Sequence, residues 1–250
     1  MAEITCLESA FAPTRDSVYR YEKKFVAVDQ SVPEIDWIIK KNPFLFRPIF
    51  HERQVNNIYF DTPRFEHFYD NVNGNSKRKK LRIRWYGNLS GVAEKPVIEA
   101  KIKRGDLGTK RSLAISAFEI KKHFSTSEIT ALLHRVPPEA AEPSLQEYRP
   151  TLVNSYIRTY YLSADRRFRI TLDRNLHYYK VGLSATSLMT RLTDRRKLII
   201  ELKYDQSESD AARSVTEHFP FRASKNSKYV SGIRKTFYHL AENEDLGDAF

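Results

Sequence analysis

One six-residue stretch, residues 81–86, carries side chains that are well suited to binding an anion. It reads LRIRWY, so that Arg82 and Arg84 alternate with Leu81, Ile83 and Trp85. Alternation with a period of two is typical of a β-strand with two different faces. A guanidinium group binds phosphate or carboxylate oxygens through paired hydrogen bonds. The two arginines therefore share one strand face that could hold an anion.

The same alternation returns in other segments, which places further charged and polar side chains on single strand faces. These side chains are Glu22 and Lys24 in 20–26, Glu99, Lys101 and Lys103 in 97–103, Tyr156 and Arg158 in 153–161, Asp173 in 168–173, and Glu201 and Lys203 in 198–204. A set of strands with cationic polar faces indicates a polyanionic ligand.

The remaining elements follow from apolar spacing and turn residues. Further strands are expected at 55–61 and after Thr109 as far as Ile115, and helices at 32–41, 64–71, 117–134, 211–219 and 230–240. The Pro-, Glu- and Ala-rich segment 136–150 is interpreted as a loop. Several strands separated by turns predict an α+β fold, with an antiparallel β-barrel and helices packed on its outside. We expect a single domain over 1–250, with a core of about 19–240 and an acidic tail at 241–250.

The periodicity leaves open which strand faces point into the barrel. If the apolar faces fill it, the charged faces are solvated. If the charged faces point inward, they line a wet tunnel, and the helices cover the apolar outside. Two cations about 5 Å apart repel by roughly 3 kcal/mol at an effective dielectric constant near 20. Charge-assisted hydrogen bonds to phosphate contribute about 1.5–3 kcal/mol each, so a threaded phosphate chain would more than offset this repulsion.

Composition limits the function classes. The 250 residues include 42 Lys and Arg against 31 Asp and Glu, for a formal net charge of +11. A single cysteine, Cys6, permits no intramolecular disulfide and suits a reducing compartment.

The sequence shows neither a secretory signal nor a transmembrane run, so a soluble, cytoplasmic protein is expected. Duplex DNA is too wide for a small barrel, and Trp85 alternates away from the arginines, so nucleic acid is not the expected partner.

Four carboxylates share the faces of the cations: Glu22, Glu99, Asp173 and Glu201. They could form neutralising ion pairs. Alternatively, Glu201, Glu22 and Asp173 could supply ligands for Mg²⁺ or Mn²⁺, which bind carboxylates together with substrate phosphates. The histidines show no zinc-ligand spacing, and no Walker-type glycine-rich loop is present.

Five motifs occur in an order that resembles a known family. They are RYEKKF at 20–25, YFDT at 59–62, KLRIRWY at 80–86, EAK at 99–101 and KNSKY at 225–229. Together they resemble the catalytic domain of the vacuolar transporter chaperone (VTC) polyphosphate polymerases, in the triphosphate tunnel metalloenzyme superfamily. This resemblance implies a basic β-tunnel and a divalent metal. It also implies transfer of the ATP γ-phosphoryl group to a growing polyphosphate.

The resemblance also implies roles for individual residues, by position in the motifs. The cations implied to act on the transferred phosphate are Lys24, Arg82, Arg84, Lys101, Arg158 and Lys228. Further substrate contacts are implied for Lys110, Tyr156, Lys203, Lys225 and Ser227. Glu201 matches the metal-binding glutamate of the family.

Two features differ from the wider superfamily. The phosphatase and cyclase branch begins with Glu-x-Glu-x-Lys, whereas this chain has Arg at position 20, followed by Glu22 and Lys24. Loss of the first carboxylate weakens two-metal hydrolysis and favours the polymerase branch. The eukaryotic polymerases also work beside membrane-spanning domains. This sequence shows no such domain, so the resemblance does not extend to the coupling of synthesis to translocation through a membrane partner.

Two other activities use the same tunnel. One is hydrolysis of inorganic triphosphate or nucleoside triphosphates, and the other is binding of polyphosphate without catalysis. The expected small ligands are thus ATP with polyphosphate or triphosphate, while the sequence specifies no oligomeric state.

Overall fold

The computed structural model describes residues 20–104, 107–136, 145 and 147–237. Cys6, the acidic tail at 241–250 and most of the 136–150 segment lie outside these residues. Within the described residues, no helix is long and apolar enough to span a bilayer.

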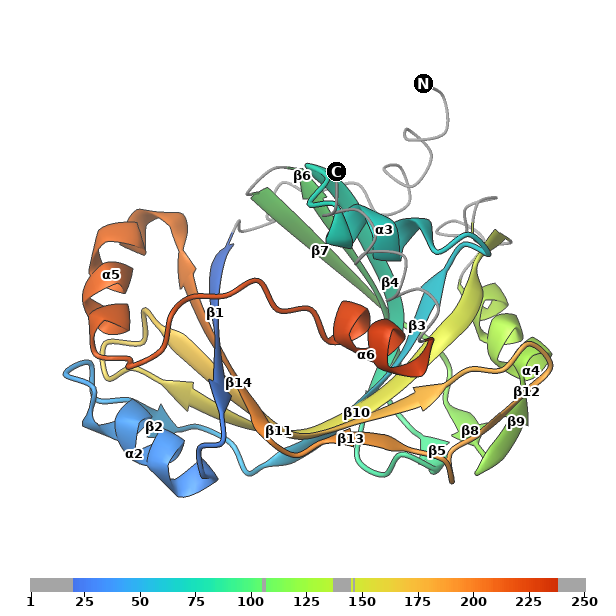
Figure 1. Ribbon diagram of the computed structural model, residues 1–250, viewed down its shortest axis with the longest axis horizontal. Helices are drawn as coiled ribbons and strands as arrows, with labels where there is room; N and C mark the ends of the chain where they lie inside the picture. The colour runs from blue at the N-terminus through green and yellow to red at the C-terminus, as the bar shows by residue number, and fades with distance from the viewer. Residues whose placement is uncertain (1–19, 105–106, 137–144, 146, 238–250) are drawn as a thin grey trace, which may run out of the picture.

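One large antiparallel sheet dominates the fold, and it curls strongly (Figure 1). In spatial order its main strands are β1 (Arg20–Val28), β14 (Lys197–Asp205), β11 (Arg169–Lys180), β10 (Arg149–Leu162), β3 (Arg53–Asp61), β4 (Lys77–Tyr86), β6 (Val97–Arg104) and β7 (Leu107–Ala114). The short strand β2 (Arg47–Pro48) pairs with β10, and β13 (Leu192–Asp194) pairs with β11. The end strands β1 and β7 approach one another, so the sheet curls toward closure.

Smaller elements cover the outside of the curl and one of its ends. Two separate two-stranded sheets pair β5 (Gly91–Ala93) with β8 (Phe118–Ile120) and β9 (His123–Ser125) with β12 (Ala185–Ser187). The helices are α2 (Val32–Lys41), α3 (Glu66–Val72), α4 (Thr126–Thr130), α5 (Ser209–Glu217) and α6 (Lys228–Thr236), with 3₁₀ turns η1 (Ala131–Arg135) and η4 (Gln206–Glu208). The expected α+β class with an antiparallel curled sheet is confirmed.

Apolar side chains cover the convex face of the sheet in two clusters. At one side, Phe25 and Ile200 pack against Ile39 of α2 and Val215 of α5. At the other side, the apolar face of β4 packs under the two small sheets, with the Trp85 ring 5.8 Å from that of Phe118. The burial of these apolar faces leaves the opposite, charged faces on the concave side. This settles the orientation that periodicity left open.

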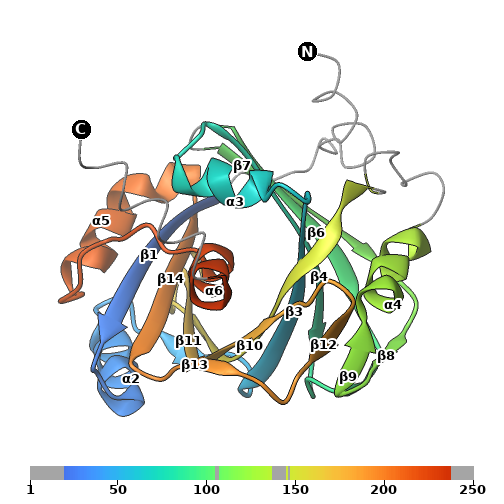
Figure 2. The same ribbon diagram turned by 45° about the vertical axis from the view of Figure 1, so that its right-hand side comes forward.

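Helix α6 departs from the expectation that the helices pack outside. It lies within the curl of the sheet, as two views show (Figures 1 and 2). Tyr229 and Ile233 pack against Leu152 and Tyr156 in a third cluster, and the Tyr229 ring stacks on Tyr59 at 5.1 Å. An apolar patch on the concave face therefore holds α6 where a charged lining would repel it.

The expected helix at 117–134 is wrong. This segment forms β8, β9, the short helix α4 and the turn η1. Phe118 and Ile120 are buried while Glu119 is exposed, a period of two that a helical reading overlooks. Ser125 and Glu128 form a capping box that starts α4 only after β9 ends.

Close packing of α6 on the sheet leads to a stability prediction at Gly232. A Cβ at this position would lie 2.3 Å from Leu152 Cδ2 and 2.7 Å from Tyr178 Cδ1. Gly232→Ala should therefore lower the free energy of unfolding by about 1–3 kcal/mol in urea titrations, because overpacking displaces buried neighbours. Ser231→Ala on the same helix is the control and should change little. Equal stability of the two variants would contradict the packing described here.

Candidate active site

Basic and acidic side chains from several strands share the concave face, as strand register requires. Lys24 lies opposite Glu201 across the β1–β14 pair, and Glu22 lies opposite Lys203. Arg82 lies opposite Glu99 across β4–β6. Strands remote in sequence thus bring their charged faces together.

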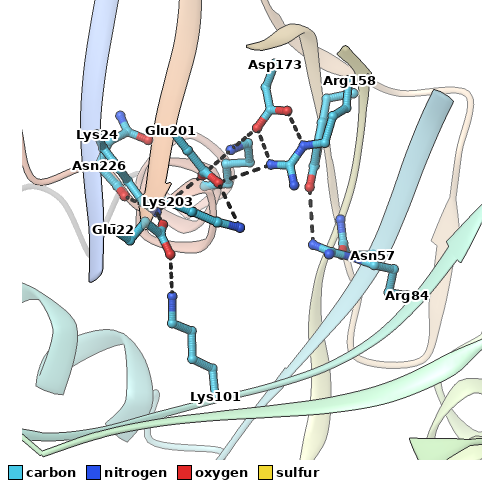
Figure 3. Close-up of polar contacts among 12 residues, drawn as sticks. Glu22, Lys24, Asn57, Arg84, Lys101, Arg158, Asp173, Glu201, Lys203 and Asn226 are labelled. Carbon is cyan, nitrogen blue, oxygen red and sulfur yellow. Dashed lines mark hydrogen bonds and ion pairs between the residues drawn. The ribbon is translucent and has the colours of Figure 1, made fainter. Parts of the chain in front are cut away.

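A deeply buried ion pair joins Arg158 of β10 to Asp173 of β11. The guanidinium binds the carboxylate through two atoms, with Nε 2.5 Å from Oδ1 and Nη2 2.6 Å from Oδ2. Arg158 Nη2 also lies 3.3 Å from Glu201 Oε2. Lys228, the first residue of α6, places its Nζ 2.5 Å from Asp173 Oδ2 and 3.2 Å from Glu201 Oε1. Asp173 therefore fixes two cations from different elements (Figure 3).

A second group of ion pairs links opposite walls of the curl. Glu22 Oε1 lies 2.9 Å from Lys24 Nζ on its own strand, and Oε2 lies 2.9 Å from Lys101 Nζ on β6 (Figure 3). Lys24 Nζ also lies 3.4 Å from Glu201 Oε1. The contact between Glu22 and Lys101 joins β1, at one edge of the sheet, to β6, near the other edge. The curl of the sheet brings these two edges together.

Glu99 organises the cations of the wall formed by β4, β6 and β7. It accepts a hydrogen bond from Arg82 Nε at 2.7 Å and forms an ion pair with Lys110 of β7. Arg84 Nη1 lies 3.6 Å from the same carboxylate. Arg84 Nε also donates to Asn57 Oδ1 at 2.9 Å. These contacts direct both guanidinium groups toward the interior.

The segment that leads into α6 contacts this interior through its backbone and side chains. Lys24 Nζ donates to the Asn226 carbonyl oxygen at 3.2 Å, and Lys80 Nζ donates to Ser227 Oγ at 2.9 Å. Ser227 Oγ also accepts from the Val230 amide as the N-cap of α6. Lys225 is exposed. Tyr229 donates its hydroxyl to buried Asp61 at 2.5 Å, which anchors the helix behind Lys228.

The pKa values of the charged groups on the concave face are shifted in different directions, according to burial and neighbouring charges. Burial alone would raise the pKa of the Glu201 carboxyl, but neighbouring cations, led by Lys228, hold this pKa well below its ordinary value. Burial and neighbouring cations, led by Lys24, hold the pKa of the Lys80 ammonium well below its ordinary value. Burial lowers the pKa of Lys203 to about 8. Burial alone would also lower the pKa of Lys24 and Lys228, but neighbouring carboxylates raise it above its ordinary value. The pKa of each lysine thus reflects its burial and its local partners.

A divalent metal fits some of these carboxylates better than others. Within the described residues, no three acidic, histidine or cysteine side chains form a group that could hold a metal. Glu22 and Glu201 face a shared cation, the Lys24 ammonium, and this donor pair suits Mg²⁺ or Mn²⁺ with further oxygens from a phosphate. Both oxygens of Asp173 lie within 2.6 Å of a nitrogen of Arg158 or Lys228, whereas the cations around the two oxygens of Glu201 lie 3.2–3.8 Å away.

Most residues singled out in the sequence lie together on the concave face. The exceptions are Ser227, which caps α6 at its edge, and exposed Lys225. Sequence reasoning overlooked Lys80 and Asn57. Lys80 continues the alternation of Arg82 and Arg84 by one step, so the period extends to it. No sequence pattern points to Asn57, because it accepts a hydrogen bond from Arg84 only once β3 and β4 pair in the folded sheet.

Comparison with known proteins gives one family match. A family model described as VTC domain matches residues 19–237. No curated protein matches the chain.

Three solved structures that match this chain are distant in sequence. A candidate adenylate cyclase from Vibrio parahaemolyticus is 14% identical, with a TM-score of 0.48 over 84% of this chain and 97% of that one. A candidate adenylyl cyclase from Hippeastrum with a dominant triphosphatase activity is 15% identical, with a TM-score of 0.46 over 88% and 97%. The RNA triphosphatase of S. pombe is 9% identical, with a TM-score of 0.30 over 97% and 87%.

The Arg158–Asp173 pair yields a stability prediction with a defined pH dependence. Burial alone would raise the pKa of Asp173, but Arg158 and Lys228 hold it below its ordinary value. Asp173→Asn should lower the free energy of unfolding by about 3–5 kcal/mol at neutral pH, because buried Arg158 and Lys228 then share only the more distant carboxylate of Glu201. Since the folded-state pKa is lower than the unfolded one, the stabilisation is present above about pH 4 and is lost as pH falls through the folded value.

Urea titrations of the wild type and Asp173→Asn between neutral pH and pH 3 measure their difference in free energy of unfolding. This difference should narrow below about pH 4. The exposed pair Asp29–Arg196 provides the control, because Asp29→Asn should leave stability nearly unchanged. A similar loss in both variants would show that burial of the pair is not what matters.

Proposed function

The chain belongs to the VTC domain family, and on this basis we propose that it is a metal-dependent polyphosphate polymerase. It would transfer the γ-phosphoryl group of ATP to the end of a growing polyphosphate chain held along the concave face of the sheet. The observation that carries this proposal is the excess of cations over carboxylates on that face.

This excess is costly without an anion. The basic side chains are Lys24, Lys80, Arg82, Arg84, Lys101, Lys103, Lys110, Arg158, Lys203 and Lys228, against the carboxylates of Glu22, Glu99, Asp173 and Glu201. A phosphate chain supplies a negative charge at each unit and oxygens that accept charge-assisted hydrogen bonds. It would relieve the repulsion around Lys80, whose ammonium donates a hydrogen bond to the neutral hydroxyl of Ser227.

Phosphoryl transfer needs positioning and charge stabilisation more than a protein nucleophile. Arg82 and Arg84 would bind phosphate oxygens from one wall, and Arg158 and Lys228 from the other. Lys24, Lys101 and Lys110 would extend these walls, while Tyr156 and Lys203 would contact the chain beside them. A terminal phosphate oxygen of the chain would then attack the γ-phosphorus in line, the bond from the γ-phosphorus to the bridging oxygen would break, and ADP would leave. The surrounding cations would stabilise the charge that develops on the phosphate oxygens.

Glu201 and Glu22 would hold the divalent cation, Mn²⁺ or Mg²⁺. A metal bound there neutralises charge on the phosphate oxygens. Because Arg158 and Lys228 lie closer to Asp173 than to Glu201, we assign Asp173 to positioning these two cations. This refines the expectation that Asp173 is a metal ligand.

Triphosphate hydrolysis is the second candidate, because it uses the same grip on phosphate. Position 20 is Arg where the hydrolytic branch carries a first glutamate, so this strand supplies one carboxylate fewer. Fewer free carboxylates favour transfer to phosphate over the two-metal activation of water.

A product assay tests the proposal. The purified protein is incubated with ATP and Mn²⁺, and the products are separated by gel electrophoresis and by free-phosphate release. Long phosphate chains are expected. Glu201→Gln should abolish the activity but retain binding of inorganic tripolyphosphate, because it removes a negative charge without removing a cation. Glu208→Gln, in a surface pair with Arg167, is the control and should remain active.

Each other outcome selects another function. Free phosphate without chains would establish triphosphate hydrolysis. Neither product, combined with tight polyphosphate binding, would establish a binding protein. Full activity of Glu201→Gln would refute the assignment of Glu201 to the metal.

The guanidinium groups give a separate binding prediction. Arg82→Ala and Arg84→Ala should each weaken tripolyphosphate binding by about tenfold or more, because each removes a charge-assisted hydrogen bond. Calorimetric titration measures the affinity. Arg167→Ala removes the same charge from the outer surface and should change the affinity little. If all three variants lose affinity equally, net charge rather than local contact determines binding.

A further inference from the structure

An arginine surrounded by aromatic rings lies at one margin of the concave face. The Arg53 guanidinium carbon is 4.5 Å from the centre of the Phe50 ring, 5.7 Å from that of Tyr160 and 5.8 Å from that of Tyr86. The Phe50 and Tyr160 rings meet edge to face at 5.7 Å. We name these four residues the aromatic cluster.

The cluster is open to solvent, although it is built from large apolar rings. Phe50 is 49% exposed and Tyr86 is 47% exposed. Exposed rings around a cation suit a planar ligand, because π-systems stack on one another and on a guanidinium plane.

Strand register places the cluster next to the proposed phosphate site. Arg53 lies opposite Arg158 across β3–β10, and Tyr160 follows Arg158 by two residues on the same strand face. Tyr86 likewise follows Arg84 by two residues at the end of β4. Two residues along a strand span about 6–7 Å. The aromatic cluster therefore continues the line of arginines outward.

The aromatic cluster and α6 lie near opposite ends of strand β10. Gly232 of α6 packs against Leu152, in the first part of β10, whereas Tyr160 lies near the end of that strand. A ligand that reaches the arginines beside the cluster would not need to displace α6.

We propose that the aromatic cluster binds the nucleobase of the nucleoside triphosphate donor by stacking. The proposal rests on the proposed function, because it assumes that Arg84 and Arg158 hold the triphosphate. The spacing along the strands leaves room for a ribose between base and phosphates. Stacking accepts any base, since every base has a π-face. The donor site should therefore discriminate weakly between purine triphosphates.

Calorimetric titration of four proteins with two ligands tests the proposal. The proteins are the wild type, Phe50→Ala, Phe50→Trp and Trp37→Ala, and the ligands are a non-hydrolysable ATP analogue and inorganic tripolyphosphate, both with Mn²⁺. Trp37 is the matched control, because it is a 59% exposed ring with Lys41 4.5 Å from its centre, on outer helix α2.

Phe50→Ala should weaken binding of the ATP analogue by at least about fivefold and leave tripolyphosphate binding unchanged. Phe50→Trp should retain analogue binding, because it keeps a stacking surface. Trp37→Ala should affect neither ligand. A non-hydrolysable GTP analogue should bind the wild type within about fivefold of the ATP analogue.

The two ligands separate failure of this inference from failure of the proposed function. If the wild type binds tripolyphosphate but Phe50→Ala leaves the analogue affinity unchanged, or weakens both ligands equally, the stacking site is wrong. If the wild type binds neither ligand, the phosphate site itself is wrong.

Discussion

The concave face depends on buried carboxylates that hold a larger number of cations in place. Asp173 is fully buried and binds both Arg158 and Lys228, while Glu99 binds Arg82 and Lys110. Without these carboxylates, cations a few ångströms apart would repel one another or withdraw to solvent. With them, the cations remain oriented inward while the total charge stays positive. The inward orientation of the cations therefore depends on these ion pairs.

Helix α6 shows how an apolar contact can serve a charged site. The rings of Tyr59 and Tyr229 stack, and Ile233 packs beside them, so the helix is held on the concave face by burial. Its first residue, Lys228, then projects onto Glu201 and Asp173. Burial of apolar area thus offsets the cost of bringing one more cation into a positive region.

The proposed chemistry divides the concave face by type of contact. Arginines and lysines would bind phosphates, two glutamates would hold a metal, and the aromatic cluster would bind the base. Contacts to phosphate would dominate this arrangement, because the sheet supplies cations along most of its width. The exposed rings around Arg53 lie only at one margin. Such a site recognises the triphosphate of its donor more strongly than the identity of the base.

The strands were largely predictable, because each half-buried strand repeats its own faces every two residues. That rule identified Arg82, Arg84, Lys24 and Glu201 as members of charged faces. The rule failed at 117–134, where the strands have only three residues each. Such short strands do not show a clear period of two, and the apolar residues around them are spaced as in a helix.

The sequence by itself determined that several strands carry cations and carboxylates on one face each, since side-chain alternation is a local property. Only the tertiary structure decided that these faces point inward, that Glu22 meets Lys101 from the opposite wall, and that α6 lies inside the curl. These features depend on the curvature of the sheet and on contacts between residues far apart in sequence. The inward direction follows from packing, because the apolar faces are buried beneath helices and small sheets on the convex side and leave the charged faces to line the interior.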